Sequence, residues 1–190
     1  MPFLVTDSAT PLPAETLPAL KLTYYYESSA RGEIYAYLRC YVHKGDFCYN
    51  LLVFEESPPV SRRIGFALCP AQNAQQFLFA SFAKPASTES LTLCSIQNSG
   101  LACVTRHLVA PQARRSAGED EQGPYWCAEG TLPASVFLEA FGKAPQAGEL
   151  WPGNVFLYDT SAPGFGAAFP CQNVQGVWQA RFEPFTIVPY

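Results

Sequence analysis

The sequence is poor in charge and has no dense basic cluster. Only 15% of its 190 residues are charged, and 12 Lys and Arg against 16 Asp and Glu give a formal net charge of −4. Basic residues adjoin only at Arg62-Arg63 and Arg114-Arg115, whereas duplex DNA or an anionic membrane requires concentrated positive potential. The composition therefore argues against nucleic acid and membranes as partners.

Long hydrophobic runs are also missing. No apolar stretch approaches the roughly 20 residues that span a bilayer. The segment 1–7 (MPFLVTD) lacks the basic start and the continuous apolar core of a secretory signal peptide. These features predict a soluble protein of the cytoplasm, or an extracellular one if the N-terminus has been trimmed.

Residue types that carry catalysis or bind metals are scarce. The two histidines, His43 and His107, lie beside no recognisable nucleophile motif, and the four aspartates cannot form a calcium-binding D-x-D-x-D-G loop. The seven cysteines are odd in number and include no C-x-x-C pair, which weakens the disulfide and zinc interpretations. We expect mostly buried cysteines, no cofactor, no metal and no enzymatic activity.

What the sequence does contain favours strands. Hydrophobic residues make up 48% and aromatic residues 14%, and 17 Pro and 13 Gly supply frequent breaks. We predict an all-β fold, an antiparallel β-sandwich of jelly-roll type, that forms a single domain over residues 1–190.

The clearest strand covers residues 33–43, where an aliphatic face alternates with an aromatic and polar face. It is predicted to form an antiparallel hairpin with 20–27 and to pair with a third strand at 47–55. Further strands are expected at 62–68, 75–82, 91–97, 101–108, 125–131, 151–159 and 178–188.

Turn residues fix part of the register and the connections. A three-residue turn at 98–100 places Cys94 opposite Val104 rather than Cys103. The segments 111–123 and 162–166 are predicted to be loops. One short helix is expected at residues 133–141, begun by Pro133 and ended by Gly142.

Three stretches resemble a known family. They are 126–133 (WCAEGTLP), an aromatic strand that runs into a proline-started helix, 151–159 (WPGNVFLYD), and 182–185 (FEPF). In this order they are similar to the family 9 carbohydrate-binding modules (CBM9) and their DOMON-like relatives. The resemblance implies a two-sheet sandwich that binds a sugar without catalysis. The acidic strands of the family are absent, because 62–67 (RRIGFA) and 76–81 (QFLFAS) carry no carboxylate.

Sugar rings lay their C–H faces on aromatic side chains, and amides, carboxylates and arginine hold their hydroxyl groups. We therefore predict an oligosaccharide or polysaccharide ligand, held at loop ends by aromatic and polar side chains. The candidate residues are Trp126, Trp151, Trp178, Arg39, Gln172 and Asn173. The alternative for each tryptophan is a structural anchor in the core or in a loop.

The face of 33–43 that carries Tyr35, Tyr37, Arg39 and Tyr41 is a second candidate, a flat platform for a polysaccharide. Its alternatives are the inner face of a sheet and a surface covered by the proline-rich N-terminal segment.

Two other functions stay open. A structural or protein-interaction domain that has lost its ligand would bury its tryptophans and expose an apolar patch, as in a homo-oligomer contact. An enzyme that uses a cysteine or a carboxylate would need a reactive thiol or a carboxylate pair, for which the spacing gives no support.

Overall fold

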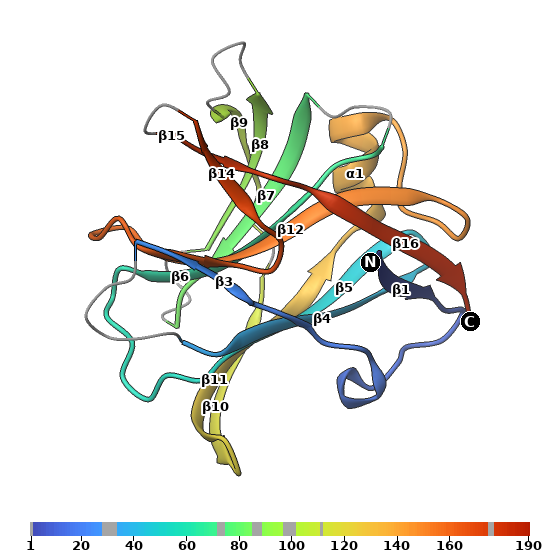
Figure 1. Cartoon of the computed structure of the whole chain (residues 1–190). Coiled ribbons are helices and arrows are strands. Elements are labelled where there is room, and N and C mark those ends of the chain that lie inside the picture. The colour runs from blue at the N-terminus through green and yellow to red at the C-terminus, as the bar shows by residue number, and fades with distance from the viewer. Residues whose placement is uncertain are drawn as a thin grey trace.

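The strands form two stacked layers (Figure 1), and buried residues alternate with less buried ones along many of them. The computed structural model describes residues 2–27, 34–71, 75–84, 89–96, 102–110, 112–174 and 177–190, with backbone alone at 102–103, 173–174 and 177–180. The elements are β1 (Phe3–Asp7), a 3-10 turn η1 (Ala14–Thr16), β2 (Leu20–Lys21), β3 (Tyr24–Tyr26), β4 (Ala36–His43), β5 (Asp46–Val53), β6 (Arg62–Leu68), β7 (Gln76–Phe82), β8 (Ser90–Ile96), β9 (Ala102–Leu108), β10 (Arg114–Asp120), β11 (Gly123–Leu132), α1 (Ala134–Phe141), β12 (Leu150–Asp159), β13 (Phe165–Ala167), β14 (Cys171–Val174), β15 (Val177–Ala180) and β16 (Glu183–Pro189).

One continuous path of hydrogen bonds runs through both layers. Its order is β10-β11-β5-β4-β1-β16-β12-β6-β7-β8-β9. The pairs along this path are antiparallel except those of β1, which lies parallel to both β4 and β16. The first layer consists of β10, β11, β5 and β4, the second of β12 and β6 to β9, and β1 with β16 joins them. The predicted all-β sandwich is confirmed.

The core lies between the layers. On β4 the residues alternate between buried and half-buried, so its aliphatic side chains point inward as predicted. From β5, the neighbour of β4 in the same layer, Phe47 and Tyr49 reach Phe66 of the second layer. Their ring centroids lie 5.4 and 5.2 Å from that of Phe66. These rings hold the layers together and leave the opposite face of each layer free to form surface.

Several local predictions are confirmed. Cys94 pairs with Val104 across β8 and β9, the predicted register, although the turn at 98–100 lies outside the described residues. The helix covers 134–141, and Gly142 ends it with φ +72°. Pro133 offers no side-chain cap, and instead Asp46 in the β4–β5 turn accepts a 2.7 Å hydrogen bond from the backbone N–H of Ala134.

The predicted loop at 111–123 is wrong. Residues 114–120 form β10, which pairs with β11 from Arg114 opposite Glu129 to Asp120 opposite Gly123. The strand lacks apolar alternation because six of its seven residues are exposed. Its backbone ladder to β11, rather than a buried face, makes it a strand, and the hairpin projects from the rest of the sheet (Figure 1).

The predicted hairpin of 20–27 with 33–43 is right only in its first part. Leu20 pairs with Leu38, but Tyr24–Tyr26 leaves this layer and pairs with β13. The predicted loop at 162–166 is therefore also wrong at its end, where β13 begins. Gly166 allows this pairing, because a Cβ there would lie 3.0 Å from the ring of Tyr25.

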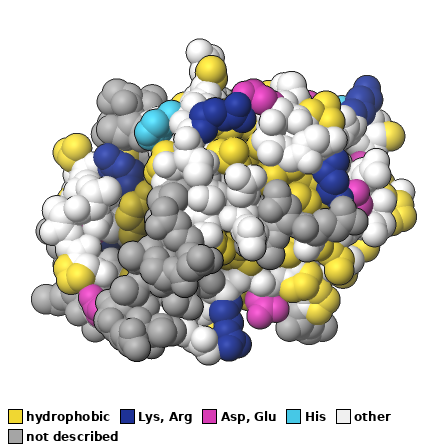
Figure 2. Space-filling view, turned by 90° about the horizontal axis from the view of Figure 1, so that it is seen from above, with side chains coloured by type: hydrophobic (Ala, Val, Ile, Leu, Met, Phe, Trp, Pro, Cys, Tyr) yellow, Lys and Arg dark blue, Asp and Glu magenta, His cyan; other side chains and the backbone are white. Residues whose placement is uncertain are grey.

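Charged side chains are spread thinly over the surface. On the part of the face in Figure 2 that the structure describes, Lys and Arg side chains lie singly around hydrophobic patches. None of the described helical segments is long and apolar enough to cross a membrane.

Candidate functional site

An aromatic cleft of about 470 Å³ lies on the outer face of the second layer. Its aromatic side chains come from β7, β12, β13 and the segment before β16. They are Phe77, Phe79, Phe156, Tyr158, Phe165 and Phe182. The volume falls in the range of about 300–1,000 Å³ that is usual for small-molecule sites.

Strand periodicity and one glycine build the floor of this cleft. Phe77 and Phe79 are two residues apart on β7, as are Phe156 and Tyr158 on β12, so each pair shares the outer face. Between these strands, β6 carries Gly65, where a Cβ would lie 2.5 Å from the carbonyl oxygen of Ala80. The missing side chain lets the ring of Phe79 lie close over the sheet.

The rings stand at angles to one another instead of stacking flat. Phe77 and Phe182 meet edge to face at 5.1 Å between centroids, and Phe79 and Phe156 do so at 6.2 Å. The contacts fix the ring planes, so the cleft is preformed.

Few polar groups line the cleft among the described residues. The hydroxyl groups of Tyr158 and Ser81 are 2.7 Å apart, and burial raises the pKa of Tyr158. At the rim, Asp159 accepts hydrogen bonds from the hydroxyl and backbone N–H of Ser161 at 2.6 and 2.9 Å. Hydrogen bonds with the Ser161 and Ser61 side chains lower the pKa of Asp159 to about 2. This carboxylate is therefore ionised at neutral pH.

Asn154 fixes the hairpin β14–β15 beside the cleft. Its buried amide donates to the carbonyl oxygens of Phe169 (3.2 Å) and Arg181 (2.9 Å) and accepts from the N–H of Phe169 (3.0 Å). The bond to Arg181 marks a break in the predicted strand 178–188, which the structure divides into β15 and β16. The Gly-Asn pair of 151–159 thus ties β12 to the base of the hairpin.

This hairpin brings three predicted site residues together along its backbone. Asn173 pairs with Trp178, and Gln172 pairs with Gln179. Gln172 is exposed. Because Phe182 follows β15 closely in the chain and lines the cleft, the hairpin begins at the edge of the aromatic cleft.

The other two tryptophans do not present rings to solvent, which corrects that expectation. Trp126 is 0% exposed and Trp151 is 1% exposed. Trp151 packs edge to face on Phe137 of α1 at 5.4 Å and donates its indole N–H to Glu149 at 2.9 Å. Both residues point into the space between the layers, so they serve as core anchors, the alternative stated for them.

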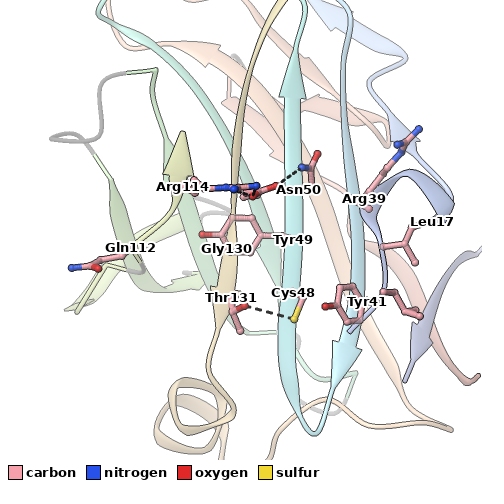
Figure 3. Close-up of a pocket in the computed structure, with 13 residues that line it drawn as sticks. Leu17, Arg39, Tyr41, Cys48, Tyr49, Asn50, Gln112, Arg114, Gly130 and Thr131 are labelled. Carbon is pink, nitrogen blue, oxygen red and sulfur yellow. Dashed lines mark hydrogen bonds and ion pairs between the residues drawn. The ribbon is translucent and has the colours of Figure 1, made fainter. Parts of the chain in front are cut away.

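Arg39 lies on the opposite side of the molecule, in a polar groove of about 510 Å³ on the outer face of the first layer (Figure 3). The side chains that define this polar groove are Arg39, Tyr41, Asn50, Arg114, Glu129 and Thr131. Cross-strand register places Arg39, Asn50, Glu129 and Arg114 in one row across four strands. The sheet thus separates Arg39 from the hairpin residues with which it was predicted to act.

The aromatic face of β4 is an outer face, half-buried. Tyr35 and Tyr37 pack against Phe54 at 5.3 and 6.4 Å, and Phe54 contacts Tyr125 at 5.8 Å. The inner-face alternative is therefore wrong. The N-terminal segment covers part of this face, because Leu12 and Leu17 form a wall of the polar groove next to Tyr41.

Three of the described cysteines, Cys40, Cys69 and Cys171, are buried thiols of raised pKa. Burial raises the pKa of Cys40 strongly and that of Cys69 and Cys171 to about 11, so these thiols stay protonated at neutral pH. Nδ1 of His43 lies 2.9 Å from the backbone carbonyl oxygen of Ser8. No group of three or more His, Cys, Asp or Glu side chains within the described ranges could hold a metal ion.

Neither a protein-family model nor a curated protein sequence matches the chain. Among solved structures, a "putative carbohydrate-binding protein" from Bacteroides uniformis ATCC 8492 superposes with a TM-score of 0.68 at 12% identity, covering 97% of this chain and 98% of that one. Two structures of a CBM9 domain from Caldicellulosiruptor kristjanssonii also match. The glucose complex has a TM-score of 0.56 at 10% identity and covers 100% and 97% of the two chains. The cellotriose complex has 0.53 at 11% identity and covers 100% and 95%.

The chain has a CBM9-like fold. Because the identities are 10–12%, the likeness establishes the fold alone. The CBM9-like fold confirms the resemblance drawn from the sequence, and its neighbours are carbohydrate-binding proteins by description.

Sequence reasoning missed the phenylalanines of the aromatic cleft. The signal was present, because aromatic residues two apart occur at Phe77 and Phe79 and again at Phe156 and Tyr158. The predicted site takes tryptophan as the residue that stacks on a sugar and therefore includes none of these phenylalanines.

Proposed function

We propose that the chain is a non-catalytic carbohydrate-binding domain that holds a neutral, glucose-type sugar in the aromatic cleft. The observation that carries this proposal is a preformed cleft, lined by rings, on the outer face of a layer in a CBM9-like fold. A pyranose ring has apolar C–H faces that stack on aromatic side chains. The bound glucose and cellotriose of the CBM9 neighbours support this choice of ligand class.

Hydroxyl recognition is assigned to the rim of the cleft. The paired hydroxyls of Tyr158 and Ser81 can both donate and accept. The hairpin β14–β15 carries Gln172, Asn173 and Trp178 in its paired strands, and we propose these residues as further partners. We keep these three residues as binding candidates, because Asn154 fixes the base of their hairpin at the cleft.

The state of Asp159 supports binding without catalysis. A glycosidase needs a carboxylic acid of raised pKa and a second carboxylate at a suitable distance. Asp159 is the one carboxylate that lines the cleft within the described ranges, and its pKa is lowered, to about 2. It can accept a sugar hydroxyl but cannot supply a proton near neutral pH.

The test is calorimetric titration with glucose, cellotriose and xylotriose, comparing the wild type with Phe156→Leu. The leucine keeps the site apolar but removes the stacking ring, so affinity should fall about three- to tenfold. Phe54→Leu, a half-buried phenylalanine on the other outer face, is the matched control and should bind as the wild type does. Circular dichroism checks that both variants fold.

The absence of heat at millimolar concentrations of all three sugars would overturn the proposal. Equal affinity in the wild type and Phe156→Leu would remove the aromatic cleft as the site. Chromatography of each mixture after prolonged incubation tests for hydrolysis. We expect every sugar to be unchanged, because the domain is proposed to be non-catalytic.

A further inference from the structure

The polar groove holds a guanidinium that is not neutralised within the protein. Arg39 forms no ion pair with any described residue, and its Nε is buried without a hydrogen-bond partner among them. The other arginine of the groove, Arg114, is paired with Glu129. A half-buried guanidinium without a carboxylate partner favours an anionic ligand, because a carboxylate would neutralise its charge.

Aromatic rings flank this cation along the same face of β4. The guanidinium carbon of Arg39 lies 5.0 Å from the ring centroid of Tyr37, and Tyr41 follows two residues later. Tyr41 lines the groove beside Cys48 and Leu12. Tyr37 lies outside the lining of the groove, whereas Tyr41 lines it with Arg39, so one ring face and the cation are available together there.

Asn50 and Glu129 add hydroxyl-binding groups in the cross-strand row that begins at Arg39. Nδ2 of Asn50 donates to Glu129 at 3.2 Å, and Arg114 holds the same carboxylate from the other side (Figure 3). The Asn50 amide oxygen and the second lone pairs of the carboxylate can still accept hydroxyl protons. Figure 3 shows Arg39 and Arg114 on opposite sides of Asn50, so the row has one paired and one unpaired arginine.

We infer that the polar groove is a second ligand site, which binds a carboxylate-bearing sugar, a hexuronic acid unit. Arg39 receives the carboxylate, Tyr41 offers a ring face, and Asn50 with Glu129 receives hydroxyl groups. The inference rests on the proposed function only in taking the ligand to be a saccharide. Both layers lie between this site and the aromatic cleft, so each can be tested alone.

The first measurement is titration with glucuronate, glucose and sodium sulfate. We expect glucuronate to bind more tightly than glucose and to weaken with added salt. Arg39→Gln should weaken glucuronate about ten- to hundredfold, the loss of a charge-assisted hydrogen bond. Arg106→Gln removes an equal charge from an exposed ion pair with Glu139 and should leave the affinity unchanged.

A second measurement locates the ligand. Cys48 lines the groove and is half-buried, whereas the other described cysteines are buried. Bound glucuronate should slow the reaction of Cys48 with a small maleimide at least severalfold, as read by peptide mass spectrometry. Arg39→Gln should abolish this protection.

Several results would overturn the inference. Equal protection of Cys48 by glucose would remove the preference for an acid, and equal protection by sulfate would leave an anion site without sugar recognition. No protection at saturating glucuronate would exclude the groove. Phe156→Leu separates the two sites, because it should weaken cellotriose and leave glucuronate unchanged. A wild-type chain that binds cellotriose but not glucuronate keeps the proposed function and loses only this site.

Discussion

Two buried tryptophans of similar exposure differ by one hydrogen bond. The indole N–H of Trp151 donates to Glu149 at 2.9 Å, whereas that of Trp126 is buried with no partner among the described residues. We expect Trp151→Phe to reduce the free energy of unfolding by about 1–2 kcal/mol more than Trp126→Phe, because only the former breaks a bond to a charged group. Urea unfolding followed by far-UV circular dichroism measures both. Equal losses would contradict the assigned bond.

Asp159 links the rim of the aromatic cleft to acid stability. Its pKa, lowered to about 2 by hydrogen bonds from Ser161 and Ser61, lies below the ordinary value near 4 of an unfolded chain. The stabilisation is therefore complete above about pH 5 and is lost as the pH falls through 4 toward 2. Asp159→Asn should unfold more easily than the wild type at pH 6, and the difference should shrink as the pH falls and vanish only below about pH 2.

Ser161→Ala tests the cause of this shift. It keeps the carboxylate but removes the hydroxyl that donates at 2.6 Å, so it should lose most of the same pH-dependent stability. The midpoint of unfolding is measured against pH for the wild type and for Asp159→Asn. If the two midpoints fall in parallel between pH 6 and 2, the Asp159 carboxylate is excluded as the titrating group.

Single residues also show what sequence could and could not reveal about the site. Alternation correctly indicates that Tyr35, Tyr37, Arg39 and Tyr41 share one face. It does not say whether an aromatic residue faces the other layer or solvent, since either face of a strand can be aromatic. The predicted site therefore includes Trp126, which is buried, and omits Phe156, which lines the aromatic cleft.

At the scale of elements, Asn154 controls the hairpin β14–β15. Replacement by Ala removes the bonds to Phe169 and Arg181 and leaves their part-buried backbone groups without this partner. We expect a loss of about 3 kcal/mol in unfolding free energy and faster amide hydrogen exchange in β14 and β15.

Asn50→Ala, which removes one half-buried bond to Glu129, is the matched control and should cost below about 1 kcal/mol. Exchange in the hairpin that is unchanged in Asn154→Ala would contradict this role.

Elements with their own local signals were predictable, and those defined by a distant partner were not. The helix 134–141 has a proline start and a glycine end, and the predicted β8–β9 register, with Cys94 opposite Val104, is the observed one. In contrast, β10 has almost no buried side chains and becomes a strand only because β11 pairs with it. The crossing of β3 to β13 joins segments about 140 residues apart, for which no local pattern exists.

At the scale of the whole molecule, the sandwich separates two surfaces of different chemistry. The aromatic cleft lies on the outer face of the second layer and the polar groove on that of the first. Alternation predicted the two layers, but the parallel pairing of β1 with β16 joins segments about 180 residues apart. Because no turn connects them, the sequence could not indicate the strand that joins the layers.

The last prediction concerns this joining strand. Val5 is 1% exposed in β1, between β16 and β4, whereas its neighbour Leu4 is 52% exposed. Val5→Thr keeps the side-chain volume but buries a hydroxyl, so it should lower the free energy of unfolding by about 1–3 kcal/mol. Leu4→Thr should change it by less than about 0.5 kcal/mol.

Urea unfolding read separately by hydrogen exchange in β5 and in β7 should show both layers losing stability equally in Val5→Thr, because β1 binds them into one cooperative unit. Loss confined to one layer would mean that the layers fold independently and that β1 does not couple them.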